Sequence, residues 1–219
     1  MSTRASLDTF RLSRMGIAER LARDIPDGYW VNLGIGAPTL VADIQHPGRE
    51  IVFQCENGLI GMGPRPADPS ERDDDIINAA KEPVTVVEGG SFVDHSESFA
   101  MIRGGHLDLA VLGAYEVSGT GDLANWRTKS DSVPAVGGAM DLAAGARAVW
   151  VMMSLCTASG DPKLVERCSY PLTAAAVVDR VFTDFAVFSI QDGRVVVDDI
   201  VPGLSFDQLQ SLTPVKLER

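Results

Sequence analysis

Apolar residues recur along this chain in two patterns, one typical of helices and one typical of buried strands. Between residues 7 and 25 they stand at positions 7, 10, 17, 18, 21, 22 and 25, which predicts an amphipathic helix ended by the Pro26-Asp27-Gly28 turn. A second helix is predicted to begin at Pro38, and helical patterns also cover residues 96–103, 139–146 and 206–212. Apolar runs predict strands at residues 29–33, 51–55, 84–88, 107–112, 148–153 and 181–188.

Strands that alternate with helices predict an α/β fold with an open, mainly parallel sheet and helices on both faces. The end of the chain departs from this alternation. There, residues 185–190 and 194–197 flank Asp192-Gly193, a pair typical of β-hairpin turns, so a C-terminal hairpin is expected. A chain of 219 residues fits one large α/β domain, and residues 1–219 are therefore expected to form a single domain.

A carboxylate followed by closely spaced glycines stands where the predicted strand 51–55 ends. The segment ENGLIGMGP (56–64) begins with Glu56 and Asn57 and carries glycines at 58, 61 and 63. Glycine lowers strand and helix stability but lets a ligand approach the backbone, which makes Glu56 a candidate nucleophile or base at the carboxyl edge of the sheet. The same residues also fit a glycine-rich turn with a solvated carboxylate, and local chemistry alone does not separate the two.

Composition and charge narrow the classes of partner. The net charge of −11 argues against nucleic acid, which needs a basic face, and no apolar run approaches the roughly 18 residues of a membrane span. The amino terminus lacks the apolar core of a signal peptide, so a cytoplasmic location is expected. The arginines at 4, 11, 14, 20 and 23 around the first helix are interpreted as a solvated face in preference to a ligand-binding patch.

Five segments in a fixed order carry a resemblance to a known family. They are VNLGIGAPTL (31–40), ENGLIGMGP (56–64), SFAMIRGGHLD (98–108), GDLANW (121–126) and VGGAMDL (136–142). Together they resemble the B (beta) subunit of the family I CoA-transferases, the 3-oxoacid CoA-transferases, and look closest to the 3-oxoadipate branch. The resemblance implies a fold related to the sugar-phosphate isomerases. It also implies a partner chain, the CoA-transferase A (alpha) subunit, with two copies of each chain in the assembly, and no metal or cofactor.

The resemblance implies the reaction as well. CoA passes from succinyl-CoA to a 3-oxo acid, with 3-oxoadipate favoured over acetoacetate, through a glutamyl-CoA thioester on Glu56. Arg127 or Lys129 are candidates to bind the distal carboxylate of a dicarboxylic acceptor, unless the partner chain does so. The residues expected to hold the oxyanion or the substrate are Asn32, Gly34, Gly36, Asn57, Gly58, Gly137, Gly138 and Ala139.

Other functions remain as alternatives. Acetoacetate could replace 3-oxoadipate as acceptor, a sugar-phosphate isomerase could use Glu56 as a proton base, and an assembly module could keep the fold without the chemistry. The isomerase is disfavoured because neither residues 32–40 nor residues 56–64 contain a Lys or Arg, which substrate phosphates would need. His95 and His106 lack the spacing of a metal pair, and His106 is interpreted as a turn or core residue.

Overall fold

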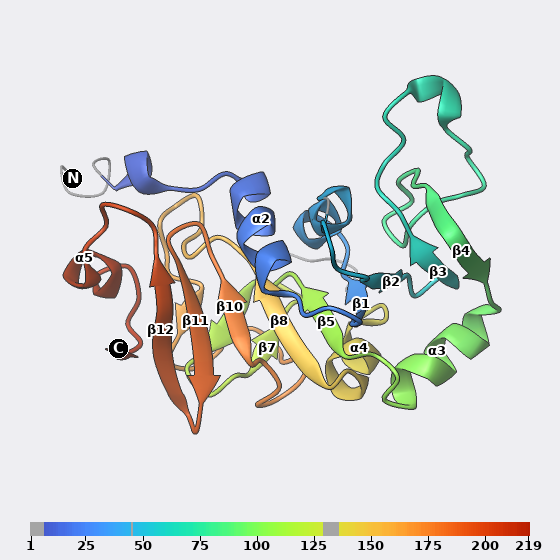
Figure 1. Cartoon of the computed structure of the whole chain (residues 1–219). Coiled ribbons are helices and arrows are strands. Elements are labelled where there is room, and N and C mark those ends of the chain that lie inside the picture. Colours follow the sequence, from blue (N-terminus) through green and yellow to red (C-terminus); the bar gives the residue numbers. More distant parts are fainter. Residues whose placement is uncertain (1–6, 45, 129–135) are drawn as a thin grey trace.

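A twisted open sheet forms the centre of the molecule. The computed structural model describes residues 7–44, 46–128 and 136–219, and within these residues the sheet has ten strands (Figure 1). Their order across the sheet is β13 (Leu217–Glu218), β12 (Arg194–Ile200), β11 (Ala186–Gln191), β10 (Arg180–Phe182), β8 (Ala148–Met152), β5 (Leu109–Leu112), β1 (Trp30–Leu33), β2 (Val52–Gln54), β3 (Leu59–Met62) and β4 (Val86–Phe92).

The centre of this sheet is parallel, and antiparallel pairs flank it on both sides, with the edge strand β13 parallel to β12. Strands β10, β8, β5, β1 and β2 all run parallel to their neighbours in this central block. On one flank β2, β3 and β4 pair antiparallel, and on the other β10, β11 and β12 do so. The prediction of an open, mainly parallel α/β sheet is therefore confirmed, whereas the antiparallel flank formed by β3 and β4 was not expected.

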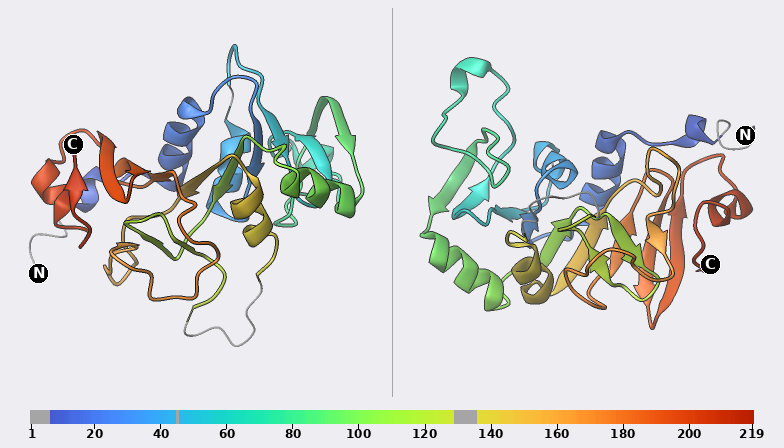
Figure 2. Two further views of the ribbon diagram at one scale, coloured as in Figure 1. Left: turned by 90° about the horizontal axis from the view of Figure 1, so that it is seen from below. Right: turned by 180° about the vertical axis from the view of Figure 1, so that it is seen from behind.

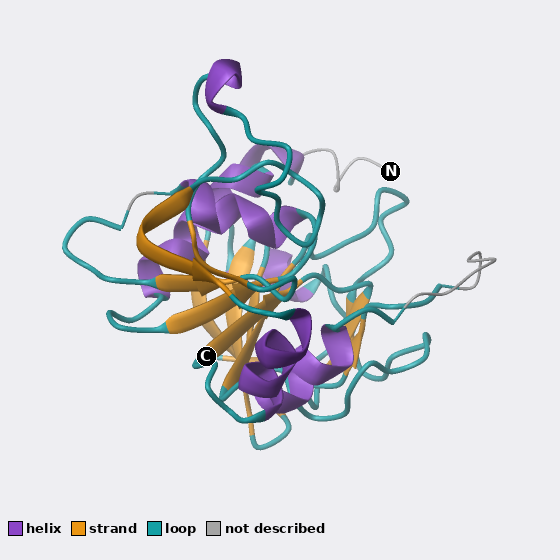
Figure 3. Ribbon diagram, turned by 90° about the vertical axis from the view of Figure 1, so that its right-hand side faces the viewer, coloured by secondary structure: helices purple, strands orange, loops and turns teal. Residues whose placement is uncertain are grey.

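Helices cover both faces of the sheet, as predicted (Figure 3). Helix α2 (Arg14–Asp24) and the 3-10 segment η2 (Ala37–Asp43) lie on one face. The other face carries α3 (His95–Arg103), α4 (Ala139–Gly145) and a small sheet of β7 (Leu123–Ala124), β6 (Glu116–Ser118) and β9 (Leu164–Val165) (Figure 2, left). The remaining helical elements of the described residues are short, namely η1 (Asp8–Phe10), η3 (Pro69–Glu71) and α5 (Phe206–Gln210).

Side chains of the central strands alternate between two apolar cores, one on each face of the sheet. In β5, Leu109 and Val111 belong to the apolar core that contains Leu21 of α2, whereas Ala110 and Leu112 belong to the core that contains Leu142 of α4. Successive side chains of a strand point to opposite faces, so one buried strand contributes to both cores. None of the helices in the described part of the chain is long and apolar enough to span a membrane.

The helix expected over residues 7–25 is shorter than predicted. Helix α2 begins only at Arg14, because the Ser13 side chain caps it by accepting a hydrogen bond from the Gly16 N–H at 3.1 Å. The residues just before the cap are extended, and the Leu12 N–H donates to the Asp184 carbonyl at 2.9 Å. The helix predicted to begin at Pro38 is a 3-10 segment, and the strand expected at 84–88 lies at 86–92 as β4.

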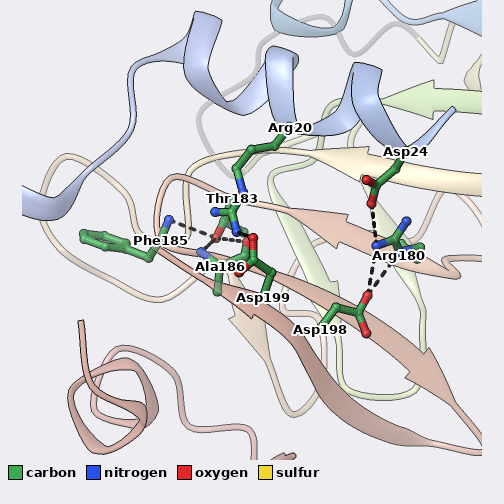
Figure 4. A network of polar contacts seen from close by, with 8 residues as sticks. All are labelled: Arg20, Asp24, Arg180, Thr183, Phe185, Ala186, Asp198 and Asp199. Carbon is green, nitrogen blue, oxygen red and sulfur yellow. Dashed lines mark hydrogen bonds and ion pairs between the residues drawn. The ribbon is translucent and has the colours of Figure 1, made fainter. Parts of the chain in front are cut away.

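The single strand predicted over residues 181–188 is wrong. A turn centred on Thr183 divides it into β10 and β11, because the Thr183 hydroxyl accepts hydrogen bonds from the N–H groups of Phe185 and Ala186 and donates to the Ala186 carbonyl (Figure 4). The predicted hairpin at the end of the chain is confirmed. It joins β11 to β12 through Asp192 and Gly193, which both have positive φ, as this kind of turn requires.

Ion pairs fasten α2 to the sheet. The Arg180 guanidinium lies 2.8 Å from the Asp24 carboxylate and 3.1 Å from that of Asp198, and Arg20 pairs with Asp199 (Figure 4). These contacts tie the helix to β10 and β12.

Candidate active site

Glu56 stands on a tight turn at the carboxyl end of β2. The Cys55 N–H donates to the Leu59 carbonyl at 2.7 Å, and the Gly58 N–H donates back to the Cys55 carbonyl at 2.9 Å. Gly58 has φ +111°, and a Cβ at this position would lie 2.2 Å from the Val93 carbonyl oxygen. The turn therefore needs glycine at 58 for its close approach to the backbone, and it holds Glu56 at the edge of the parallel sheet where α/β folds place ligands.

The Glu56 carboxylate faces the turn that begins α4. A Cβ on Gly138 would lie 2.2 Å from Glu56 Oε2 and 3.0 Å from Phe99 Cζ, so the carboxylate occupies the space that a side chain would fill. Gly137 precedes it with φ +57°, and Ala139 is the first residue of the helix. The structure thus brings together the Glu56 segment and the 137–139 segment, which are far apart in the sequence.

Burial changes the acidity of the candidate nucleophile. Partial burial raises the pKa of the Glu56 carboxyl above its ordinary value, nearby His95 acts to lower this pKa, and Asp141 acts to raise it. The His95 ring lies 4.7 Å from the Phe99 ring, measured between centroids. Nothing in the sequence indicated this role, because His95 was considered there only as a possible metal ligand.

A chain of buried amides and a hydroxyl lies beneath the Glu56 turn. Asn32 Nδ2 donates to Gln54 Oε1 at 2.6 Å and to the Gln54 carbonyl at 3.0 Å. Gln54 Nε2 then donates to Ser98 Oγ at 2.6 Å, and Ser98 Oγ reaches the Cys55 carbonyl at 3.4 Å. The side chains of Asn32, Gln54 and Ser98 are at most 1% exposed, so the predicted amide of Asn32 points into this chain.

A cleft of about 590 Å³ opens in front of Glu56. Gly34, Gly137, Gly138 and Ala139, four of the residues expected to hold the oxyanion or the substrate, line it together with Glu56. Gly36 lines an adjoining cleft of about 490 Å³. The other lining residues of the first cleft are Arg14, Ile35, Ala37, Leu112, Gly113, Ala114, Tyr115, Asn125, Val136 and Leu142.

Three predicted site residues do not line either cleft. Asn32 is buried behind the turn, and Gly58 is buried against Val93. The exposed Asn57 side chain donates through Nδ2 to the Ile77 carbonyl at 2.8 Å, so it links the turn to the segment before β4. These residues shape the Glu56 turn.

Arg14 is a lining residue that sequence reasoning assigned to the solvated face. It begins α2 and borders both clefts, beside Gly34 of the first glycine loop, which contains no cation of its own. Of the two cations predicted to bind a distal carboxylate, Arg127 lines neither cleft and Lys129 lies outside the described residues.

A half-buried carboxylate at the edge of a parallel sheet, facing glycine backbone across a cleft, defines a site suited to covalent catalysis by a carboxylate nucleophile. The sequence profile of the coenzyme A transferase family matches residues 14–211, and this chain belongs to that family. The predictions of the family and of the enzyme class are confirmed.

Characterised relatives cover nearly the whole chain. It is 55% identical over 210 residues to the B subunit of the 3-oxoadipate CoA-transferase of Pseudomonas putida, covering 95% of this chain and 98% of the relative. It is 48% identical to the B subunit of the 3-oxoadipate CoA-transferase of Acinetobacter baylyi, covering 94% and 95%. Identity to the B subunit of the succinyl-CoA:3-ketoacid coenzyme A transferase of Helicobacter pylori is 47%, covering 94% and 98%.

Solved structures share the fold at lower identity. An acyl-CoA transferase of Escherichia coli, YdiF, superposes with a TM-score of 0.74 at 19% identity, over 95% of this chain and 42% of that longer chain. The glutaconate coenzyme A-transferase of Acidaminococcus fermentans gives a TM-score of 0.67 at 16% identity, over 94% and 86%. The decarboxylase AibA/AibB gives 0.64 at 16% identity, over 94% and 84%.

Proposed function

We propose that this chain is the beta subunit of a CoA-transferase built from two kinds of chain, which moves CoA from succinyl-CoA to 3-oxoadipate through Glu56. The observation that carries the proposal is the Glu56 carboxylate, which is half-buried against Gly138 and faces a cleft large enough for an acyl group. The names of the relatives support the donor and acceptor classes. The cytoplasm is the proposed location.

Glu56 would act as the nucleophile in two symmetric half-reactions. Its carboxylate attacks the thioester carbonyl of succinyl-CoA, the C–S bond breaks, and a mixed anhydride and CoA thiolate form. The thiolate then attacks the Glu56 carbonyl, which releases succinate and leaves CoA on Glu56 as a thioester. The acceptor carboxylate attacks this thioester, the C–S bond breaks, and a second anhydride and CoA thiolate form. The thiolate then attacks the acceptor carbonyl, which releases the new acyl-CoA and the free Glu56 carboxylate.

Each attack creates a tetrahedral oxyanion that needs donors. Removing one such donor typically costs about 3 to 4 kcal/mol of transition-state stabilisation. The backbone N–H groups of Gly138 and Ala139 are the proposed donors, because their turn contacts the Glu56 carboxylate directly. Asn32 would contribute through Gln54 and the Glu56 turn, since its amide is buried behind that turn.

Covalent trapping tests the nucleophile. The assembled enzyme, incubated with succinyl-CoA without acceptor, should accumulate a thioester that hydroxylamine or borohydride converts to a stable label on the peptide holding Glu56. The variant Glu56→Ala should lose both label and turnover, and Glu56→Asp should lose most of its turnover because its carboxylate retracts by about one methylene. The matched control Glu71→Ala, on the exposed loop that projects from the sheet, should behave as the wild type (Figure 1). A label on another residue would refute the proposal.

A partner chain, the alpha subunit, forms part of the proposal, with two copies of each chain in the assembly. The net charge of −11 leaves anionic CoA with little cationic support from this chain alone. The purified chain should therefore show no turnover until the alpha subunit is added, and the active complex should contain both chains in equal number. Full turnover by this chain alone, or a native complex of this chain only, would overturn the partnership.

The acceptor is tested by steady-state kinetics. With succinyl-CoA fixed, kcat/KM for 3-oxoadipate should exceed that for acetoacetate. Equal values, or a preference for acetoacetate, would assign the chain to the general 3-oxoacid branch. Isomerisation of sugar phosphates without any transfer of CoA would instead support the alternative in which Glu56 is a proton base.

A further inference from the structure

We propose that Arg14 binds the distal carboxylate of the dicarboxylic acyl group and thereby selects dicarboxylic acids. This inference rests on the proposed transfer reaction. The cleft in front of Glu56 and the adjoining cleft share a wall made of Arg14, Ile35, Ala37, Gly113 and Ala114. Arg14 therefore stands where the two clefts meet, at the carboxyl ends of β1, β5 and β8.

The backbone at Arg14 is held in place by contacts on both sides. Ser13 caps α2, and the Leu12 N–H donates to the Asp184 carbonyl at 2.9 Å. The Asp184 carboxylate in turn accepts a hydrogen bond from the Leu155 N–H at 2.7 Å. A residue that begins a capped and anchored helix keeps its position relative to the cleft, as a specificity residue must.

The other cations that line the adjoining cleft, Arg11 and Lys163, have carboxylates beside them. The Arg11 Nε lies 3.2 Å from Asp184 Oδ2, and Lys163 also faces this carboxylate. The Arg11 guanidinium also lies 3.3 Å from Asp8 Oδ1, so two carboxylates accompany the two cations. Among the residues that the structure describes, Arg14 has no hydrogen-bond or ion-pair partner, so its guanidinium is available to a ligand.

Apart from Arg14, the residues that line both clefts are apolar residues or glycine. Ile35 is 63% exposed there, and Ala37 and Ala114 continue the surface. A dicarboxylic acyl group has a reacting carboxyl group, a short carbon chain and a distal carboxylate. Glu56, this apolar wall and Arg14 match those three parts in order. Guanidinium binds carboxylate in a bidentate manner, so Arg14 is the chemically suited partner.

A pair of acceptors that differ only at the distal end tests the inference. 3-Oxoadipate and 3-oxohexanoate have six carbons each, and the second replaces the distal carboxylate with a methyl group. In ping-pong kinetics, kcat/KM for the acceptor depends only on its reaction with the thioester enzyme, so the donor cancels. The wild type should prefer 3-oxoadipate by roughly ten- to hundredfold, as a charge-assisted hydrogen bond allows.

The variant Arg14→Met should lose this preference by lowering kcat/KM for 3-oxoadipate, with the value for 3-oxohexanoate unchanged within about threefold. Arg14→Lys should restore part of it. The matched control Arg23→Met removes the same charge from the exposed last turn of α2, outside both clefts, and should keep the wild-type preference.

An unchanged preference in Arg14→Met would overturn the inference. An equal loss for both acceptors, together with a raised KM for every acyl-CoA, would also overturn it, because Arg14 would then bind a CoA phosphate. Calorimetry with adipate and hexanoate on the assembled enzyme gives a test that does not need turnover. Adipate should bind more tightly than hexanoate only when Arg14 is present, so the inference can stand or fall independently of the proposed reaction.

Discussion

Gly138 and Glu56 are matched in shape, because the Glu56 carboxylate occupies the place where a Cβ at position 138 would stand. The distance from that Cβ to Glu56 Oε2 would be 2.2 Å, well inside van der Waals contact. The backbone of Gly138 has φ −82° and ψ 0°, which an alanine adopts without strain. The need for glycine here therefore comes from the carboxylate.

The variant Gly138→Ala should lose activity while keeping stability. The new methyl group displaces the carboxylate, and a misplacement of about 1 Å can cost on the order of a hundredfold in kcat. Thermal unfolding should change little, since no backbone strain is added. In the double variant Gly138→Ala with Glu56→Asp, the shorter side chain withdraws from the methyl group, so the two losses should be less than additive. Full additivity would show that the two positions do not interact.

The pKa of Glu56 predicts the acid side of the pH profile. Burial raises this pKa, and the nucleophile must be ionised, so kcat/KM should fall with decreasing pH at a midpoint above the ordinary glutamate value of about 4.3. His95→Gln removes a neighbour that lowers the pKa, so the midpoint should rise. Asp141→Asn removes a neighbour that raises it, so the midpoint should fall. Shifts of the same sign in both variants would contradict this assignment.

The hydrogen bonds among the buried Asn32, Gln54 and Ser98 should affect both the stability of the protein and its rate. Gln54→Leu removes one hydrogen bond each from the Asn32 amide and the Ser98 hydroxyl and leaves their bonds to the Gln54 and Cys55 carbonyls, which should cost about 1 to 3 kcal/mol in urea unfolding. The rate constant kcat should fall with little change in KM, because the hydrogen-bonded side chains of Asn32, Gln54 and Ser98 support the Glu56 turn and do not line the cleft. Gln191→Leu, on the exposed C-terminal hairpin, is the matched control and should have little effect on either quantity. Equal losses in both variants would point to a general effect of the substitution.

Local sequence patterns indicated which residues lie around the cleft. Glu56 lies at the end of a strand, and the turns at Gly34 and Gly138 border the cleft in front of it, because strand runs and glycine clusters are local signals. The strand β3 was missed because glycines 58 and 61 weaken its pattern. Thr183 and Asp184 did carry a signal that residues 181–188 are not one strand, since two polar residues interrupt an apolar run there.

Contacts between distant segments could not be predicted in this way. The partners of Gln54 come from β1 and α3, and no spacing in the sequence links Asn32 to Ser98. Charge patterning alone assigned Arg14 to a solvated face, because charged residues around a predicted helix are usually solvated. The cap of α2 at Ser13, and the hydrogen bond from the Leu12 N–H to the Asp184 carbonyl, hold the start of the helix where Arg14 lines the same cleft as Gly34 and Gly138. Such relationships arise from the packing of α2 on the sheet.

Gly58 should be required for folding of the Glu56 turn. A Cβ there meets the Val93 carbonyl oxygen at 2.2 Å, and φ is +111°, so neither a rotamer change nor a small shift relieves Gly58→Ala. The strain of the backbone and the clash should together cost about 3 kcal/mol or more in unfolding free energy. Gly48→Ala is the matched control, because Gly48 also has a positive φ of +74° but no atom within 4 Å of its Cβ, and it should lose only about 1 kcal/mol. Equal losses in the two variants would mean that the contact with Val93 contributes nothing and that the turn depends on backbone conformation alone.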